Sequence, residues 1–450
     1  MGVSRRGVVA KYLERYAEPE AAFGTRLTRS AQHIVVIPAH NESSTFFQGI
    51  QPALVRVTAQ GERALCIVVV NATDAQDAES QTRNQSLIDT LTAKTSAVPI
   101  HAQHETPCWY GQDEKFDLIV LDRNREGHRL PSHEGVGLAR KIGGDLALAT
   151  VHAGISDARL IHMTDCDVQL PTEYFTATVG PSSAALIYPF LHEPCGEALI
   201  DEAHARYEAY LRYYTLGLQY AGSPYGFHTI GSCMAIKPAA YAGVRGVPKR
   251  QAGEDFYLLN KLAKLGSIET AISSPITIHA RHSQRVPFGT GRATHDIAKN
   301  IEAYRIYDPR VFDLLKAWLS ALSMIEGMPP SCAYDAVWCQ ASKHLVPKDR
   351  DRLKKALASI DAPRALRQAA AQSDAMSVRK KWISDWFDAF RTLKLIHALR
   401  DAGFVDVAWR QGLSDASFCR PPSMTSEGSP FELCRGLARL EEPRVYHENL

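Results

Sequence analysis

Four short apolar runs rich in β-branched residues recur in the first half of this 450-residue chain. They cover residues 33–38 (HIVVIP), 64–71 (ALCIVVVN), 117–122 (DLIVLD) and 159–165 (RLIHMTD). Each run is too short and too β-branched for a helix, so each predicts a buried strand. Helix-like segments separate the runs, the clearest over 133–154 with Ser132 as the expected N-cap. This alternation favours an α/β fold in which helices cover both faces of a mostly parallel sheet.

The second half of the chain has a different pattern. Strand-like runs (AALIYPF and SCMAIKP) flank a helix expected over 202–221, and a further helix is expected to begin at Glu254 and end at Gly266. After about residue 300 the pattern is mostly helical. One helix over 377–403 is expected to bury a single apolar face made of Trp382, Trp386, Phe390 and Leu393. We therefore expect an N-terminal extension (1–29), an α/β domain (30–300) and a helical C-terminal region with its tail (301–450).

The global composition excludes several classes of protein. The net charge is only +2, which gives no sign of a nucleic-acid partner. No segment has the roughly 18 apolar residues that a membrane-spanning helix needs, and the N-terminus lacks the apolar core of a secretory signal. The nine cysteines are scattered without a Cys-x-x-Cys pair, which indicates reduced thiols. These features predict a cytoplasmic protein.

Two carboxylates lie at the end of the fourth run and just beyond it, in the stretch LIHMTDCDVQLP. Asp165 and Asp167 are two residues apart, so on an extended chain both side chains point the same way. Two like charges held together need a cation to neutralise them, and Mg²⁺ or Mn²⁺ prefers such oxygen ligands and shares them with phosphates. A solvated loop is the alternative, and Asp-x-Asp alone is a common motif. The carboxyl ends of parallel strands are where ligands bind in α/β sheets.

Three further motifs accompany this pair of carboxylates. The first run leads directly into small and polar residues in IVVIPAHNES. The helix before the fourth run carries two basic residues, Arg140 and Lys141. After the loop KRQAG, a helix opens with Glu254 and Asp255. Acids there can simply complement the helix dipole, but one of them could also take a proton from a substrate hydroxyl.

The ordered set VVIPAHNES, VVVNATD, GVGLARKIGGDLAL, MTDCDVQLP and GEDFYLL resembles family-2 glycosyltransferases of the GT-A fold, over about residues 30–295. The resemblance implies transfer of a sugar from a UDP- or GDP-sugar to an acceptor, with Mn²⁺ or Mg²⁺ as cofactor. It implies an inverting displacement with Asp255, beside Glu254, as catalytic base. Asp167 would contact the metal and Asp165 the ribose or sugar. Further donor-binding residues would be Pro38, His40, Glu42, Asn71, Asp74, Arg140 and Lys141.

Other assignments depend on analogy within this resemblance. A histidine from a late strand serves as a metal ligand in related enzymes, and His279 is preferred here over His282. Arg281 and Arg285 could clamp phosphate, or they could be solvated loop arginines. Asn71 stands where the family has an aspartate, so the base stays open. Tyr207, Tyr210 and Tyr214 share a helix face that could stack on an acceptor sugar, with core packing as the default.

Several alternatives stay open at this point. A retaining transferase of the same donor class, or a degenerate non-catalytic protein that binds sugar nucleotides or acts as a scaffold, would share these motifs. A nucleotidyltransferase would need a glycine-rich loop after the first strand, and PAHNESSTFF has no glycine. The acceptor could be a small metabolite, a glycan or a peptide. The helical C-terminal region could cover the acceptor site, bind a partner or form a homodimer.

Overall fold

The computed structural model describes residues 5–101, 106–281, 290–323, 332–372, 376–419 and 429–441. The chain forms two compact units. The first contains residues 1–201 and 229–295, and the second contains residues 202–228 and 296–450. The second unit thus includes most of a helix that lies well before residue 300 in the sequence.

The first unit is built on a sheet that has nine strands within the described residues, in the order β11-β8-β10-β6-β1-β2-β5-β4-β3. The central neighbours β6, β1, β2 and β5 run parallel, whereas β10 is antiparallel to β6 and β8, and β4 is antiparallel to β5 and β3. The strands are β1 (His33–Ala39), β2 (Ala64–Asn71), β3 (Val98–Pro99), β4 (Cys108–Gln112), β5 (Phe116–Arg123), β6 (Ile161–Met163), β8 (Ala185–Ile187), β10 (Met234–Ile236) and β11 (Ile268–Thr270).

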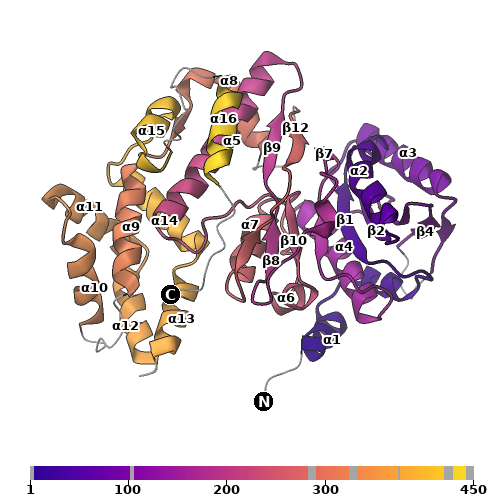
Figure 1. Ribbon diagram of the computed structural model, residues 1–450, viewed down its shortest axis with the longest axis horizontal. Coiled ribbons are helices and arrows are strands. Elements are labelled where there is room, and N and C mark those ends of the chain that lie inside the picture. Colours follow the sequence, from indigo (N-terminus) through magenta and orange to yellow (C-terminus); the bar gives the residue numbers. More distant parts are fainter. Residues whose placement is uncertain are drawn as a thin grey trace. The chain divides into compact units, whose positions relative to one another are not determined.

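Helices enclose this sheet. Every residue of β2 is buried, as expected for a strand covered on both faces. Helix α4 packs against β1, β2 and β6, and α3 packs against β2 and β5 (Figure 1). The helical segments of this unit are α1 (Arg5–Arg15), η1 (Pro19–Thr25), α2 (Phe46–Ala59), α3 (Ala78–Lys94), α4 (Gly135–His152), η2 (Tyr174–Thr176), α6 (Pro238–Gly243) and α7 (Glu254–Leu262). The predicted α/β architecture with a mostly parallel central sheet is confirmed.

The boundaries of α4 and α7 differ from those expected. Helix α4 begins at Gly135 after Glu134, so Ser132 is not its N-cap. Residues 131–134 instead form a turn in which the Glu134 N–H donates to the Pro131 carbonyl oxygen. Helix α7 begins at Glu254 as predicted but ends at Leu262, four residues before Gly266. The start of α7 is the feature that matters for the site.

The first unit also contains a second, smaller sheet. Within the described residues it has three strands, in the order β7-β12-β9. Its strands are β7 (Val168–Gln169), β9 (Phe190–Glu193) and β12 (Ile276–His279). Strand β12 is antiparallel to β7, and the His279 N–H donates to the Asp167 carbonyl oxygen at 2.9 Å. This pairing brings the chain after β12 next to Asp167.

The second unit is mostly helical, as predicted. Its helices are most of α5 (Ala198–Tyr220), part of α8 (Thr290–Lys299), η3 (Ile301–Ala303), α9 (Arg310–Leu322), α10 (Ala333–Ser342), α11 (Pro347–Ser359), α12 (Ala362–Gln372), α13 (Met376–Trp386), α14 (Ala389–Asp401), α15 (Trp409–Asp415), η5 (Ser417–Cys419) and α16 (Pro430–Leu440). The second unit also contains one short antiparallel pair of strands, β13 (Arg305–Ile306) and β14 (Val407–Ala408). Among the described helices, none combines the length and the apolarity that a membrane crossing requires.

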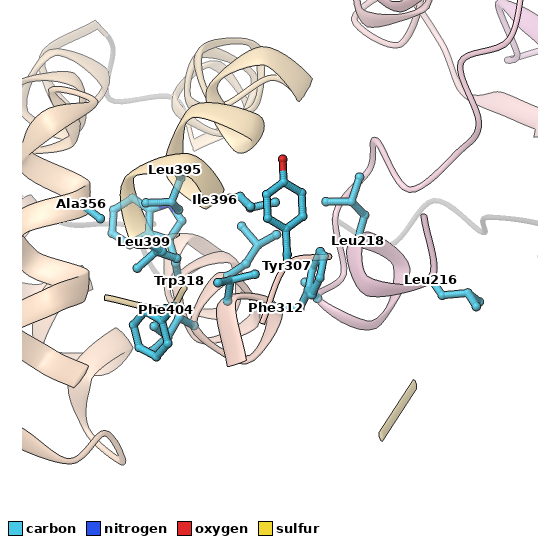
Figure 2. Packing of buried hydrophobic residues seen from close by; sticks show 14 of the residues in the cluster. Leu216, Leu218, Tyr307, Phe312, Trp318, Ala356, Leu395, Ile396, Leu399 and Phe404 are labelled. Atoms are coloured by element: carbon cyan, nitrogen blue, oxygen red, sulfur yellow. The ribbon is translucent and has the colours of Figure 1, made fainter. Parts of the chain in front are cut away.

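The core of the second unit gathers buried apolar residues from several helices, α9 and α14 among them. Figure 2 shows Trp318 of α9 beside Leu395 and Leu399 of α14. The single helix expected over 377–403 is wrong: α13 ends at Trp386, and the Asp388 carboxylate caps α14 by accepting a hydrogen bond from the Arg391 N–H at 3.1 Å. The four residues expected on one face are therefore divided between two helices.

Four of the five tyrosines of α5, all but Tyr207, belong to this core or pack against it. Tyr210 and Tyr214 pack against the apolar cluster, and both rings lie close to that of Tyr307. Tyr207 stacks on Tyr210 with 6.4 Å between their ring centroids, and the centroids of Tyr210 and Tyr214 are 6.3 Å apart. For Tyr210 and Tyr214, the default expectation of core packing is the one that the structure supports.

Candidate functional site

The candidate site lies where the parallel strands of the first unit end. Because β6, β1, β2 and β5 run parallel, their carboxyl ends meet at one edge of the sheet. His40 and Glu42 follow β1, Asn71 ends β2, and Asp165 follows β6 by two residues. The sequence runs that predicted the strands therefore also predicted which polar residues gather at this edge.

Arg140 is the centre of the site. Its side chain is only 3% exposed, and its Nη2 donates to Asp165 Oδ1 at 2.6 Å and its Nε to Glu254 Oε1 at 2.9 Å. Its Nη1 donates to the Gly231 carbonyl oxygen at 3.0 Å, a contact that no sequence motif indicated. Although burial alone would lower it, the surrounding carboxylates, Asp165 first among them, raise the pKa of Arg140 above its ordinary value. Arg140 thus joins residues that are far apart in the sequence.

A glycine in α4 allows this junction to form. A Cβ at Gly137 would lie 2.5 Å from the Pro248 carbonyl oxygen, so only glycine lets the 248–251 loop approach the helix this closely. The Gly137 N–H donates to the Arg250 carbonyl oxygen at 3.0 Å. The loop then turns at Gly253, whose φ of 70° suits glycine, and α7 begins at the next residue. The close approach of loop and helix brings Glu254 to Arg140.

Asp255 lies beside this junction at the first turn of α7. Its Oδ1 accepts a hydrogen bond from the Phe256 N–H at 2.7 Å. Burial of the carboxyl group, together with the negative charge of Glu254, raises the pKa of Asp255 to about 7. A carboxyl group with such a pKa can accept and release a proton near neutral pH, as a general base must.

Arg281 forms a second junction at the same edge. Its Nη2 lies 2.7 Å from Asp167 Oδ2, and its Nη1 lies 2.9 Å from Glu42 Oε1. The guanidinium therefore bridges a residue that follows β1 and a residue that follows β6. Although burial alone would lower it, the charges of Asp167 and Glu42 raise the pKa of Arg281. The sequence indicated all three residues but not that they pair with one another.

The two junctions form one charged group, here named the carboxylate cluster, made of Glu42, Asp165, Asp167, Glu254 and Asp255 with Arg140 and Arg281. Burial raises the pKa of Asp165 to about 6; Arg140 opposes this shift, whereas the nearby charges of Asp167 and Glu254 add to it. The pKa of Asp165 therefore depends on the charges of both junctions. With every group ionised, the cluster has five negative and two positive charges, so a further cation would be favoured there.

The expected donor-binding residues near the ends of β1 and β2 have different roles. The Asn71 Nδ2 donates to the carbonyl oxygens of Ala39 and Val69, both at 3.1 Å, so this amide nitrogen holds the strand ends together and does not face a ligand. His40 Nδ1 lies 2.9 Å from the Asn71 carbonyl oxygen. Pro38 is buried in β1, whereas Asp74 is exposed. Of these four residues, Asp74 is the one whose side chain is exposed to solvent.

Asn84 of α3 was missed by the sequence reasoning. Its Nδ2 donates to the Asn71 carbonyl oxygen at 2.9 Å, and its Oδ1 accepts from the Asn41 N–H at 2.7 Å. Asn41 has a left-handed backbone with φ of 55°, which asparagine tolerates better than most residues. A helical asparagine in a polar helix gives no sequence signal of this kind.

Lys141, expected beside the donor, lies elsewhere. Its Nζ donates to Asp145 Oδ2 at 2.8 Å, to the Tyr12 hydroxyl at 2.6 Å and to the Tyr16 carbonyl oxygen at 2.9 Å. Successive residues of a helix point about 100° apart, so Arg140 and Lys141 face different surroundings. Lys141 holds the N-terminal segment against α4.

Of the residues expected to bind the metal, not all lie in the carboxylate cluster. Asp167 belongs to the carboxylate cluster, but the His279 side chain is half exposed, with Nδ1 at 3.4 Å from Glu193 Oε2. His282 and Arg285 lie outside the described residues.

Within the described residues, no group of three or more His, Cys, Asp or Glu side chains could hold a metal ion. Mg²⁺ often takes only one or two protein carboxylates and completes its shell with water and phosphate. Glu42 and Asp167 are the two carboxylates that Arg281 bridges, and their oxygen atoms are of the ligand type that such an ion takes.

Comparison with known proteins adds no family. No protein-family model matches the chain, and a search of curated proteins also found no match.

Proposed function

We propose that this protein is a metal-dependent glycosyltransferase of the GT-A fold that moves a sugar from a nucleoside-diphosphate donor to an acceptor, with inversion. The observation that carries the proposal is the carboxylate cluster at the carboxyl ends of β1 and β6. It combines an Asp-x-Asp pair with a separate carboxyl group, Asp255, whose pKa of about 7 suits a general base. Sugar transfer needs both a cation for the leaving diphosphate and a base for the acceptor.

The charge of the cluster supports the requirement for a metal. Arg140 and Arg281 are already paired with carboxylates, so neither offers an uncompensated positive charge to a diphosphate. A diphosphate approaching this net negative cluster would be repelled. A divalent cation bound by Asp167 and Glu42 would offset the negative charge that develops on the leaving diphosphate.

The remaining residues then have separate roles. Asp165, which Arg140 orients, would accept hydrogen bonds from hydroxyl groups of the donor. Asp255 would accept the proton of the acceptor hydroxyl as its oxygen attacks the anomeric carbon and the bond to the diphosphate breaks. Glu254 would act through Arg140, as a residue that positions Asp165.

A thermal-shift screen tests the donor and the metal. UDP-glucose, UDP-N-acetylglucosamine and GDP-mannose are each added with and without Mn²⁺. A donor present at 100 times its Kd should stabilise the folded protein by about 2.7 kcal/mol, because it binds only the folded state. We expect this shift for one base only, and only with Mn²⁺ present.

Asp167→Ala and Asp89→Asn serve as the comparison pair for this screen. Asp167→Ala should abolish the metal-dependent shift, since it removes a carboxylate of the cluster. Asp89 is exposed on α3, away from the cluster residues in the sequence, and Asp89→Asn, which also removes one negative charge, should keep the response to Mn²⁺. Equal shifts for Asp167→Ala and the unaltered protein would refute the metal–donor hypothesis.

The pH dependence of donor hydrolysis follows from Asp255. Its base form is the deprotonated one, so kcat/KM should rise through a pH of about 7 and fall as the carboxyl group binds a proton at lower pH. The charged groups that set this pKa are Glu254 and Asp165, which raise it, and Arg140, which lowers it. A rate that does not vary between about pH 5.5 and 8.5 would exclude Asp255 as the base.

A further inference from the structure

We propose that Arg281 is an exchangeable counter-ion of the donor site. In the ligand-free protein its guanidinium neutralises Glu42 and Asp167, and on donor binding it leaves them and pairs with the donor's diphosphate. This inference rests on the proposed function, because it describes how the same site changes between its free and its donor-bound state.

The geometry of Arg281 supports the first half of this proposal. One guanidinium nitrogen lies 2.7 Å from Asp167 Oδ2 and the other lies 2.9 Å from Glu42 Oε1. The two carboxylates come from different strand ends, so the guanidinium occupies the position between them that a cation shared by both would need. A side chain in this place competes directly with a divalent ion for the same oxygen atoms.

The surroundings of Arg281 allow it to leave. Its side chain is 32% exposed, whereas that of Arg140 is 3% exposed and is held by two carboxylates and a main-chain oxygen. Arg281 also stands two residues beyond β12, outside the ladder that pairs this strand with β7 and β9. Of the two arginines in the cluster, Arg281 is therefore the one that can exchange partners without disturbing the sheet.

The charges explain why exchange would accompany donor binding. Paired with Glu42 and Asp167, the guanidinium leaves this part of the cluster with one net negative charge, which repels a diphosphate. Once a divalent ion neutralises the two carboxylates, the guanidinium loses its ionic partners there. A planar guanidinium binds phosphate oxygens through two parallel hydrogen bonds, so the diphosphate is the matching new partner.

Two binding measurements on full-length Arg281→Gln test the proposal. Isothermal titration with Mn²⁺ alone should show affinity about tenfold tighter than in the unaltered protein, because the competing ion pairs are removed. Titration with inorganic diphosphate in the presence of saturating Mn²⁺ should show affinity about tenfold weaker, because the new partner is lost. A residue that only supported the fold would not shift the two affinities in opposite directions.

Three variants provide the controls. Arg83→Gln removes the same charge from an exposed pair with Glu79 on α3 and should change neither affinity. Arg281→Lys keeps the charge but not the planar guanidinium, so its affinities for Mn²⁺ and for diphosphate should lie between those of Arg281→Gln and the unaltered protein. If Arg281→Gln does not fold, the same two titrations are made with Arg281→Lys. Asp167→Ala should abolish Mn²⁺ binding.

The outcomes separate this inference from the proposed function. Mn²⁺ binding that depends on Asp167 but is equal in Arg281→Gln and the unaltered protein would overturn the counter-ion role and leave the proposed function standing. Absence of Mn²⁺ binding in both proteins, or equal binding in Asp167→Ala, would overturn the metal requirement and the counter-ion role together.

Discussion

Replacing Asp255 with asparagine is expected to slow donor hydrolysis by roughly 10²- to 10⁴-fold, the usual contribution of a positioned general base. Asparagine keeps the shape of the side chain and can still accept the Phe256 N–H hydrogen bond at its Oδ1. It cannot accept a proton from the attacking hydroxyl. The rate of release of the nucleoside diphosphate, measured with the donor found in the thermal-shift screen, gives the size of the effect.

The stability of the same variant separates a catalytic effect from misfolding. The pKa of Asp255 in the folded protein is about 7, which is above the ordinary aspartate value. Above that pH the ionised carboxylate therefore lowers the stability of the folded state, and protonation at lower pH stabilises it. Asp255→Asn should therefore melt at no lower a temperature than the unaltered protein at pH 8. Its residual rate should lose the rise near pH 7. A rate within tenfold of the original would remove Asp255 from the catalytic role.

Replacing Arg140 with methionine is expected to lower the free energy of unfolding by about 3 kcal/mol or more, because removal of one partner of a buried ion pair leaves an uncompensated buried charge. Glu254 is 4% exposed and would lose its guanidinium partner, and the Gly231 carbonyl oxygen would lose a donor. Urea denaturation measures the change. A loss below about 1 kcal/mol would mean that water or another group replaces the guanidinium.

Lys141→Met is the matched control for this variant. Lys141 is the neighbouring buried cation on the same helix, and its removal should also destabilise the protein because Asp145 loses its partner. Only Arg140→Met should move the pH–rate profile to higher pH, because Arg140 lowers the pKa of Asp255. A double variant with Glu254→Gln should recover part of the stability lost by Arg140→Met. An equal shift of the profile in Lys141→Met would contradict the role given to Arg140.

The four central parallel strands of the first unit, β1, β2, β5 and β6, could be predicted from local sequence. The run 64–71 coincides with β2, and the run 33–38 falls one residue short of β1. A buried parallel strand is a continuous β-branched run, and this pattern needs no knowledge of distant residues. The fourth run placed Asp165 at the end of a strand, and the parallel pairing of β1 with β6 places it at the same edge of the sheet as the residues that follow β1.

Helix boundaries in the second unit were less predictable. The apolar residues over 377–403 are spaced for a helix throughout, yet the chain ends α13 at Trp386 and starts α14 at Ala389. Asp388 caps the new helix, and Phe387 is buried against Trp318 of α9. Burial against another helix outweighed the local preference for a continuous one, which periodicity alone does not reveal.

The sequence by itself determined the four central parallel strands, the residues at their carboxyl ends and the acids that open α7. Only the tertiary structure decided which charges meet. Arg140 and Lys141 are adjacent in the chain, yet one pairs with Glu254, 114 residues away, and the other with Tyr12, 129 residues away. The physical reason is that a helix turns neighbouring residues toward different surroundings, while the loop held at Gly137 and the strand ends deliver partners from distant segments. Local patterns do not contain that information.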